Sequence, residues 1–199
     1  MSTAEQLMRM TEEEYLAFDR AAVGVKHEYF NGEVHAMSGG GFRHSVIASN
    51  VGRVLGNQLT GKPCQVTQSD MRLKINETKA YVYPDVMVVC GKPALLGKAD
   101  DLLTNPTVIV EVLSPSTALH DKQAKFAHYR KMPSVQDILF VDSQSLSVEA
   151  YRRSPGETWL LTAHDTRETV VQLSLDVGLP MAELYEGIDF EATADGDVG

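Results

Sequence analysis

Two carboxylates lie in or beside apolar stretches of the sequence. Glu111 interrupts the run Val-Ile-Val-Glu-Val-Leu at positions 108–113, and Asp85 follows Pro84 at the head of Val86–Cys90. A carboxylate buried among aliphatic side chains is unfavourable unless it is paired, protonated or bound to a metal ion. If the two stretches are neighbouring strands, both carboxylates converge on one point and suit the oxygen shell of Mg²⁺ or Mn²⁺. Taken singly, Glu111 could instead form a structural ion pair and Asp85 could be a strand-entry residue.

The segment that follows Glu111 supplies a cation for the same site. Asp121, Lys125 and Tyr129 are spaced four residues apart, so they share one face of the predicted helix. From the first turns of that helix, Lys125 could orient an attacking water and neutralise charge in the transition state. Asp121 would then orient Lys125, and Tyr129 would pack or hydrogen-bond beneath it. The alternative is a surface Asp–Lys pair that contributes a few tenths of a kcal/mol.

Two further residues are secondary candidates. Asp70 lies in the middle of a predicted strand and could line the cleft, although an exposed strand face would also carry an aspartate. His44 begins a helix beside the glycine loop at positions 39–41. It could contact phosphate, but capping or packing is the favoured interpretation.

The elements that must position these residues alternate between helical and extended patterns. Thr11 and Glu14 form a capping box that starts a helix over Thr11–Asp19, and Asn31-Gly32 indicates a hairpin turn. Apolar spacing predicts a helix over His44–Leu59. Two long strands, 64–75 and 80–90, are expected to pair through the polar tetrad 76–79. The remaining expected elements are a loop or weak helix at 92–105, a buried central strand at 107–113, a helix at 118–131, a strand at 137–142, a hairpin of 147–152 with 158–162, a last strand at 170–173 and a small helix at 180–185.

The composition indicates one globular domain at residues 1–188, followed by a flexible acidic tail at 189–199. The chain has 199 residues, a net charge of −9 and no apolar run long enough to cross a bilayer. No secretory signal is visible, and two cysteines, Cys64 and Cys90, make no disulfide framework, so we expect a reduced, cytoplasmic protein. The acidic balance argues against tight DNA binding without a metal ion.

Pro84-Asp85, the strand with Glu111 and the nearby lysine resemble the PD-(D/E)XK nuclease superfamily. The standard lysine lies two residues after the acid, where this chain has Leu113, but displacement onto the next helix is a known variation that Lys125 matches. Over roughly residues 10–188 the chain is also similar to the bacterial Uma family of restriction-endonuclease-like proteins. The matching stretches are His27-Glu28-Tyr29-Phe30-Asn31-Gly32-Glu33, His44, Tyr83-Pro84-Asp85-Val86, and Glu111-Val112-Leu113-Ser114-Pro115-Ser116-Thr117 with Asp121, Lys125 and Tyr129.

The resemblance implies an α/β fold with a restriction-endonuclease-like core, in which helices flank a mixed central sheet and hairpins are added at both ends. It implies an active centre at Asp85, Glu111 and Lys125, with the Val112 carbonyl as a further metal ligand and Glu28 nearby. Glu28 could equally be a salt-bridge partner in its hairpin. The resemblance also implies a homodimer and DNA as substrate.

The sequence therefore predicts a metal-dependent endonuclease that hydrolyses DNA phosphodiester bonds. The alternative is a catalytically silent module on a nuclease scaffold that binds nucleic acid or protein, because fold alone does not fix function.

Overall fold

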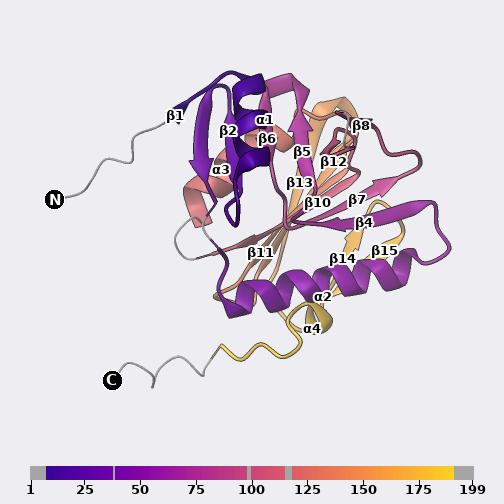
Figure 1. Cartoon of the computed structure of the whole chain (residues 1–199). Coiled ribbons are helices and arrows are strands. Elements are labelled where there is room, and N and C mark those ends of the chain that lie inside the picture. Colours follow the sequence, from indigo (N-terminus) through magenta and orange to yellow (C-terminus); the bar gives the residue numbers. More distant parts are fainter. Residues whose placement is uncertain (1–7, 38, 98–99, 115–117, 191–199) are drawn as a thin grey trace, which may run out of the picture.

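The computed structural model describes residues 8–190 except positions 38, 98–99 and 115–117, and the side chains of 118–121 also lie outside the described part. The fold is mixed α/β, as predicted (Figure 1). A six-stranded sheet has the order β13 (Thr158–His164), β12 (Val148–Ser154), β11 (Asp137–Asp142), β10 (Val108–Leu113), β7 (Val86–Cys90) and β4 (Cys64–Gln68). A seven-stranded sheet has the order β1 (Met8–Arg9), β3 (Glu33–Ala36), β2 (His27–Phe30), β6 (Ala80–Val82), β5 (Arg72–Ile75), β9 (Leu102–Leu103) and β8 (Leu95–Leu96).

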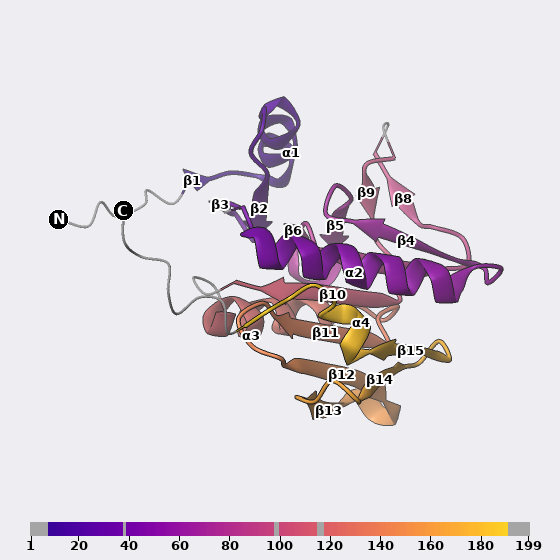
Figure 2. The ribbon, with the colours of Figure 1, turned by 90° about the horizontal axis from the view of Figure 1, so that it is seen from below.

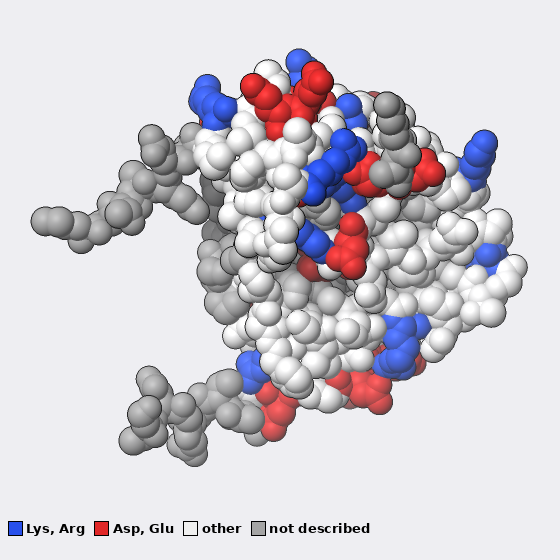
Figure 3. All heavy atoms as spheres, in the orientation of Figure 1, with Lys and Arg blue, Asp and Glu red and all other residues white. Residues whose placement is uncertain are grey.

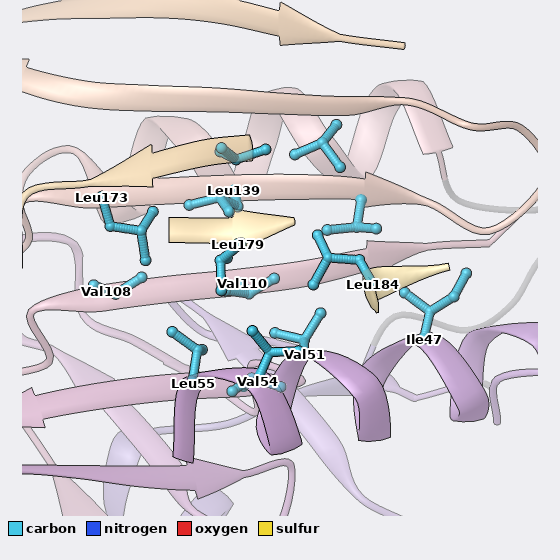
Figure 4. Packing of buried hydrophobic residues seen from close by; sticks show 14 of the residues in the cluster. Ile47, Val51, Val54, Leu55, Val108, Val110, Leu139, Leu173, Leu179 and Leu184 are labelled. Carbon is cyan, nitrogen blue, oxygen red and sulfur yellow. The ribbon is translucent and has the colours of Figure 1, made fainter. Parts of the chain in front are cut away.

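Strand β10 is the buried central strand that the sequence predicts. It pairs in parallel with β11 and antiparallel with β7, so the sheet is mixed. Helix α2 (Phe42–Leu59), α4 (Met181–Leu184) and the hairpin of β14 (Val170–Leu173) with β15 (Val177–Pro180) pack on one face of the sheet. Figure 4 shows Val51 and Leu55 of α2 beside Val110 of β10. Helix α3 (Ala118–Tyr129) packs on the other face, where Tyr129 joins the cluster around Ile109.

Alternation along β10 decides which layer each side chain enters. Val108, Val110 and Val112 belong to the cluster on the α2 face, whereas Ile109 belongs to the cluster on the α3 face. Because successive side chains of a strand point to opposite faces, Glu111 points with Ile109 toward α3. Figure 1 shows α2 below the strands of this sheet and α3 above them at the left, and in Figure 2, seen from below, α2 and α4 lie on the near side.

The long hairpin at residues 64–90 is present, but each predicted strand is broken in two. One arm divides into β4 and β5, the other into β6 and β7, and both arms pass from the six-stranded sheet to the seven-stranded sheet. The paired residues Gln68↔Val86 and Leu73↔Val82 leave positions 69–72 opposite 83–85. One arm thus contains an extra residue, which bends the ladder. Pro84, which has no N–H to donate to the ladder, accounts for the break in the second arm.

Most of the other predicted elements are confirmed near their expected bounds. The capping box of Thr11 and Glu14 starts α1 (Glu12–Ala21), and Asn31 and Gly32 turn the β2–β3 hairpin with positive φ values of 47° and 105°. The exceptions are local. The segment 92–105 contains the short strands β8 and β9, the strand at 170–173 is followed by β15, and α3 ends at Tyr129.

The prediction of two unpaired cysteines is wrong. Cys64 and Cys90 lie directly opposite each other at the end of the β4–β7 ladder, and a disulfide joins them. The hairpin register creates this pairing, which two isolated cysteines in a sequence do not reveal. In the part of the chain that the structure describes, no helix is long and apolar enough to span a membrane. Most of the predicted acidic tail, residues 191–199, lies outside the described residues.

Candidate active site

Side chains from five segments that are distant in the sequence line one open cleft of about 1190 Å³. They are Glu28 from β2, His44 from α2, Asp85 just before β7, Glu111 and Val112 from β10, and Lys125 from α3. The β2–β3 hairpin, the start of α2 and α3 lie toward the same side of the molecule (Figure 1). The sequence candidates that were predicted to converge are therefore close in space.

Asp85 is held by the backbone of the neighbouring strand. The pairing of Val86 with Val110 places Asp85 next to the end of β10. Its Oδ2 accepts a hydrogen bond from the Val112 backbone N–H at 2.8 Å and lies 3.3 Å from Nε2 of His44. The carboxylate is thus fixed at the point where β7 and β10 diverge.

Glu111 is buried, with only 4% of the residue exposed. The Tyr129 hydroxyl donates a hydrogen bond to its Oε1, and Nζ of Lys125 lies 3.2 Å from the same oxygen. Lys125 also lies 3.2 Å from Oε1 of Glu28, so one ammonium group bridges two carboxylates. Burial raises the pKa of Glu111 to about 8. Lys125 opposes this shift, while the negative charges of Asp85 and Glu28 add to it.

His44 lies in the cleft rather than in a cap. The hydrogen bond to Asp85 raises the pKa of His44 above its usual value. Burial opposes this rise, and a hydrogen bond with the backbone of Val112 supports it. The N-cap of α2 is Gly41, which makes no side-chain capping bond. The capping or packing interpretation favoured by the sequence is therefore replaced by contact with Asp85.

The remaining candidates are placed as follows. Asp70 lies outside the cluster: its side chain is 97% exposed and forms an ion pair with Lys26 at 2.5 Å. It falls on the bend between β4 and β5, not in a strand that faces the cleft. Asp121 belongs to α3, but its side chain is outside the described part. Lys122 forms an ion pair at 2.6 Å with Glu149 of β12.

Sequence reasoning missed a buried polar network behind Glu28. Asp19 accepts hydrogen bonds from the Tyr83 hydroxyl and from the His27 backbone N–H, and its Oδ2 lies 2.5 Å from Nη2 of Arg72. His27 precedes Glu28 in the chain, and Tyr83 lies two residues before Asp85. The network thus connects the two backbone segments that carry these acids. The network becomes visible only in the three-dimensional structure, because no sequence pattern marks its members as buried partners of one another.

The donors present suit a hard divalent cation with several water ligands. Within the described ranges, no three His, Cys, Asp or Glu side chains converge as a complete metal site. Mg²⁺, however, is commonly held by one or two carboxylates plus waters and substrate oxygens. Glu28 and Glu111 each lie 3.2 Å from Lys125, and the negative charge of Asp85 acts on Glu111 from the same cleft. This excess of negative charge fits a bound cation.

The mixed sheet with its cluster of acids and a lysine defines a nuclease-like α/β protein. The chain belongs to the Uma2 family, described as "Putative restriction endonuclease", whose sequence model matches residues 12–183. It is 34% identical over 182 residues to the uncharacterized protein slr1290 of Synechocystis sp., covering 92% of this chain and 94% of that protein. It is 37% identical over 153 residues to the uncharacterized protein sll1609 of the same organism, covering 77% and 86%.

A solved structure has the same fold. The crystal structure of a "putative nuclease belonging to DUF820" from Anabaena variabilis matches with a TM-score of 0.74 at 17% identity, covering 88% of this chain and 97% of that one. The restriction-endonuclease-like fold predicted from the sequence is thus confirmed.

Proposed function

We propose that this protein is a metal-dependent endonuclease that hydrolyses DNA phosphodiester bonds, with Mg²⁺ or Mn²⁺ as cofactor. The observation that carries the proposal is the convergence of Asp85, Glu111 and Lys125 in one cleft, with the lysine 3.2 Å from the buried glutamate. A carboxylate inside an otherwise apolar strand is unfavourable unless it is paired, protonated or bound to a metal ion, and a role in metal binding gives a reason for Glu111 at this position. Membership of the Uma2 family supports the nuclease class.

Each residue has a defined role in this proposal. Asp85 and Glu111 would hold the metal ion together with the backbone carbonyl of Val112. The bound metal would lower the pKa of a water molecule and stabilise negative charge on the phosphate. Lys125, which lines the cleft 3.2 Å from Glu111, would hold the attacking water and a phosphate oxygen with its ammonium group. Tyr129 would fix the orientation of Glu111 through its hydroxyl hydrogen bond.

The proposal extends to assembly, domain organisation and location. A homodimer would present two such clefts to the two strands of a duplex, and residues 1–188 would form one domain. The proposed location is the cytoplasm, where a DNA substrate is present. A disulfide such as Cys64–Cys90 is rare in that reducing compartment.

A catalytically silent binding module is the second candidate, and the charge distribution favours it. The net charge is −9, and on the face in Figure 3 the described lysines and arginines are scattered, some of them beside acidic side chains, and form no continuous basic band. Non-specific binding to a duplex normally depends on such a band. A metal ion in the acidic cleft would supply part of the missing positive charge.

Cleavage of supercoiled plasmid and of single-stranded DNA, with Mg²⁺ or Mn²⁺ against EDTA, tests the proposal. Wild type should nick DNA only with metal, and Glu111→Ala should lose activity by orders of magnitude, because a metal ligand is removed. Glu149→Ala is the matched control, since Glu149 pairs with Lys122 outside the cleft. Its activity should equal that of wild type. No cleavage by wild type, together with no heat of metal binding, would refute the nuclease and favour the binding module.

A further inference from the structure

We propose that His44 is a positioning residue that holds Asp85 through Oδ2 and leaves Oδ1 for the metal ion, and that Gly40 is required to seat it. The inference rests on the proposed function, because it concerns how a metal ligand is presented. Neither residue has a role of this kind in the family resemblance.

The two oxygens of Asp85 have different environments. Oδ2 receives the Val112 backbone N–H at 2.8 Å and faces Nε2 of His44 at 3.3 Å. Two donors from different elements therefore converge on a single oxygen. Among the residues that the structure describes, none donates a hydrogen bond to Oδ1. Because a carboxylate oxygen that already accepts two hydrogen bonds is a poor ligand, Oδ1 is the oxygen left for a cation.

The hydrogen bond to Asp85 also argues that His44 is not itself a ligand. A ring nitrogen that donates N–H to a carboxylate has no lone pair for a metal ion. Nε2 is the nitrogen that faces Asp85, and Nδ1 lies against Gly40. Carboxylate ligands are commonly oriented by such hydrogen bonds from neighbouring residues.

Helix α2 gives His44 a fixed position. Ile47 and Val51, one and two turns further along the helix, are fully buried in the cluster that contains Val112. Figure 4 shows both residues on the sheet-facing side of α2. The helix therefore packs on the same strand that carries the second donor to Asp85, so the His44–Asp85–Val112 arrangement is held on both sides.

Gly40 explains why the loop before α2 is glycine-rich at that position. A Cβ atom on Gly40 would lie 2.4 Å from Nδ1 of His44, closer than real contacts allow, whereas a Cβ on Gly39 or Gly41 would meet nothing within 4 Å. None of these three glycines has a positive φ that would itself require glycine. Any side chain at position 40 would therefore displace the imidazole ring from Asp85.

Mn²⁺ binding without nucleic acid tests the inference independently of catalysis. Calorimetry and electron paramagnetic resonance would compare wild type with His44→Ala, His44→Gln and Gly40→Ala. Loss of an orienting partner typically lowers metal affinity by about 10- to 100-fold. We expect that loss in His44→Ala and Gly40→Ala, and partial recovery in His44→Gln, whose amide can still donate to Asp85.

Gly39→Ala is the matched control and should bind Mn²⁺ like wild type, because its new methyl group meets open space. Unchanged affinity in both His44→Ala and Gly40→Ala would overturn the inference. So would an imidazole-nitrogen coupling to Mn²⁺ in wild type that His44→Ala removes, because His44 would then be a ligand. If wild type binds no Mn²⁺, the proposed function itself fails, and the inference with it. Circular dichroism checks that each variant is folded, and Gly40→Ala keeps the test decisive if His44→Ala does not fold.

Discussion

Replacing Glu111 by glutamine should make the metal-free protein more stable at neutral pH while abolishing the proposed activity. Glutamine keeps the shape of a protonated Glu111 and removes its charge. Burial raises the pKa of Glu111 from 4.5 to about 8 in the folded protein. When the pKa of a carboxyl group is higher in the folded state than in the unfolded state, the free energy of unfolding decreases as the pH rises from the unfolded-state pKa to the folded-state pKa. The substitution removes that loss.

The size of the effect follows from the same pKa difference. One pH unit corresponds to about 1.4 kcal/mol, so the interval from 4.5 to pH 7 corresponds to a gain of about 3 kcal/mol in the free energy of unfolding. The gain should vanish near pH 4.5 and stop growing above pH 8. Lys125 remains paired with Glu28 in the variant, so no cation is left without a partner.

Urea denaturation in EDTA at pH 5, 7 and 8.5 measures the effect. Glu149→Gln is the control: burial raises the pKa of Glu149, but hydrogen bonds from Lys122 and Tyr151 lower it further, so the net shift is downward. That substitution should give no stabilisation at any of the three pH values. If Glu111→Gln were neutral or destabilising at pH 7, the Lys125 ion pair would fully offset burial, and the reasoning would be refuted.

Three further predictions concern the fold. Burial raises the pKa of Asp19, but hydrogen bonds from Tyr83 and Arg72 hold the pKa below 3.8 overall. Asp19→Asn should therefore lower the free energy of unfolding by about 3–5 kcal/mol at pH 7. It should also weaken the fall in melting temperature that wild type shows as the pH drops below about 4. Leu55→Ala should cost about 2–5 kcal/mol in urea unfolding, whereas the exposed Leu160→Ala should cost under about 0.5 kcal/mol. Reducing the Cys64–Cys90 disulfide, which closes a loop with a sequence separation of 26, should cost about 3 kcal/mol, and a variant with both cysteines changed to serine should no longer respond to reductant.

The sequence predicted the core of the site because local patterns determine it. The apolar run around Glu111 predicted a strand buried on both faces, and the convergence of Asp85 with Glu111 was predicted on the condition that the run after Asp85 formed the neighbouring strand. The four-residue spacing of Lys125 and Tyr129 needed only the period of a helix. Their placement near Glu111 then followed from the short connection between strand and helix.

Features that depend on tertiary register were not predicted. The partner of His44 is 41 residues away, so no local pattern identifies it. The pairing of Cys64 with Cys90 depends on a ladder whose register changes by one residue between β5–β6 and β4–β7. The alternation of residue types along a strand does not reveal such a change of register, because the position of the extra residue depends on the bend between the sheets and not on residue type. Asp70 was misplaced for the same reason, since it lies in that bend.

Asp85 lies at the bend where the chain passes between the two sheets. The backbone from Tyr83 to Asp85 is the joint at which the hairpin leaves one sheet and enters the other. Glu28 belongs to the seven-stranded sheet and Glu111 to the six-stranded sheet, so any rotation of one sheet against the other would change the separation of these carboxylates. The distance between the carboxylates of Glu28 and Glu111 would therefore vary with the angle between the two sheets. A substrate that forced the sheets apart would lose its alignment with these carboxylates before any bond is cut.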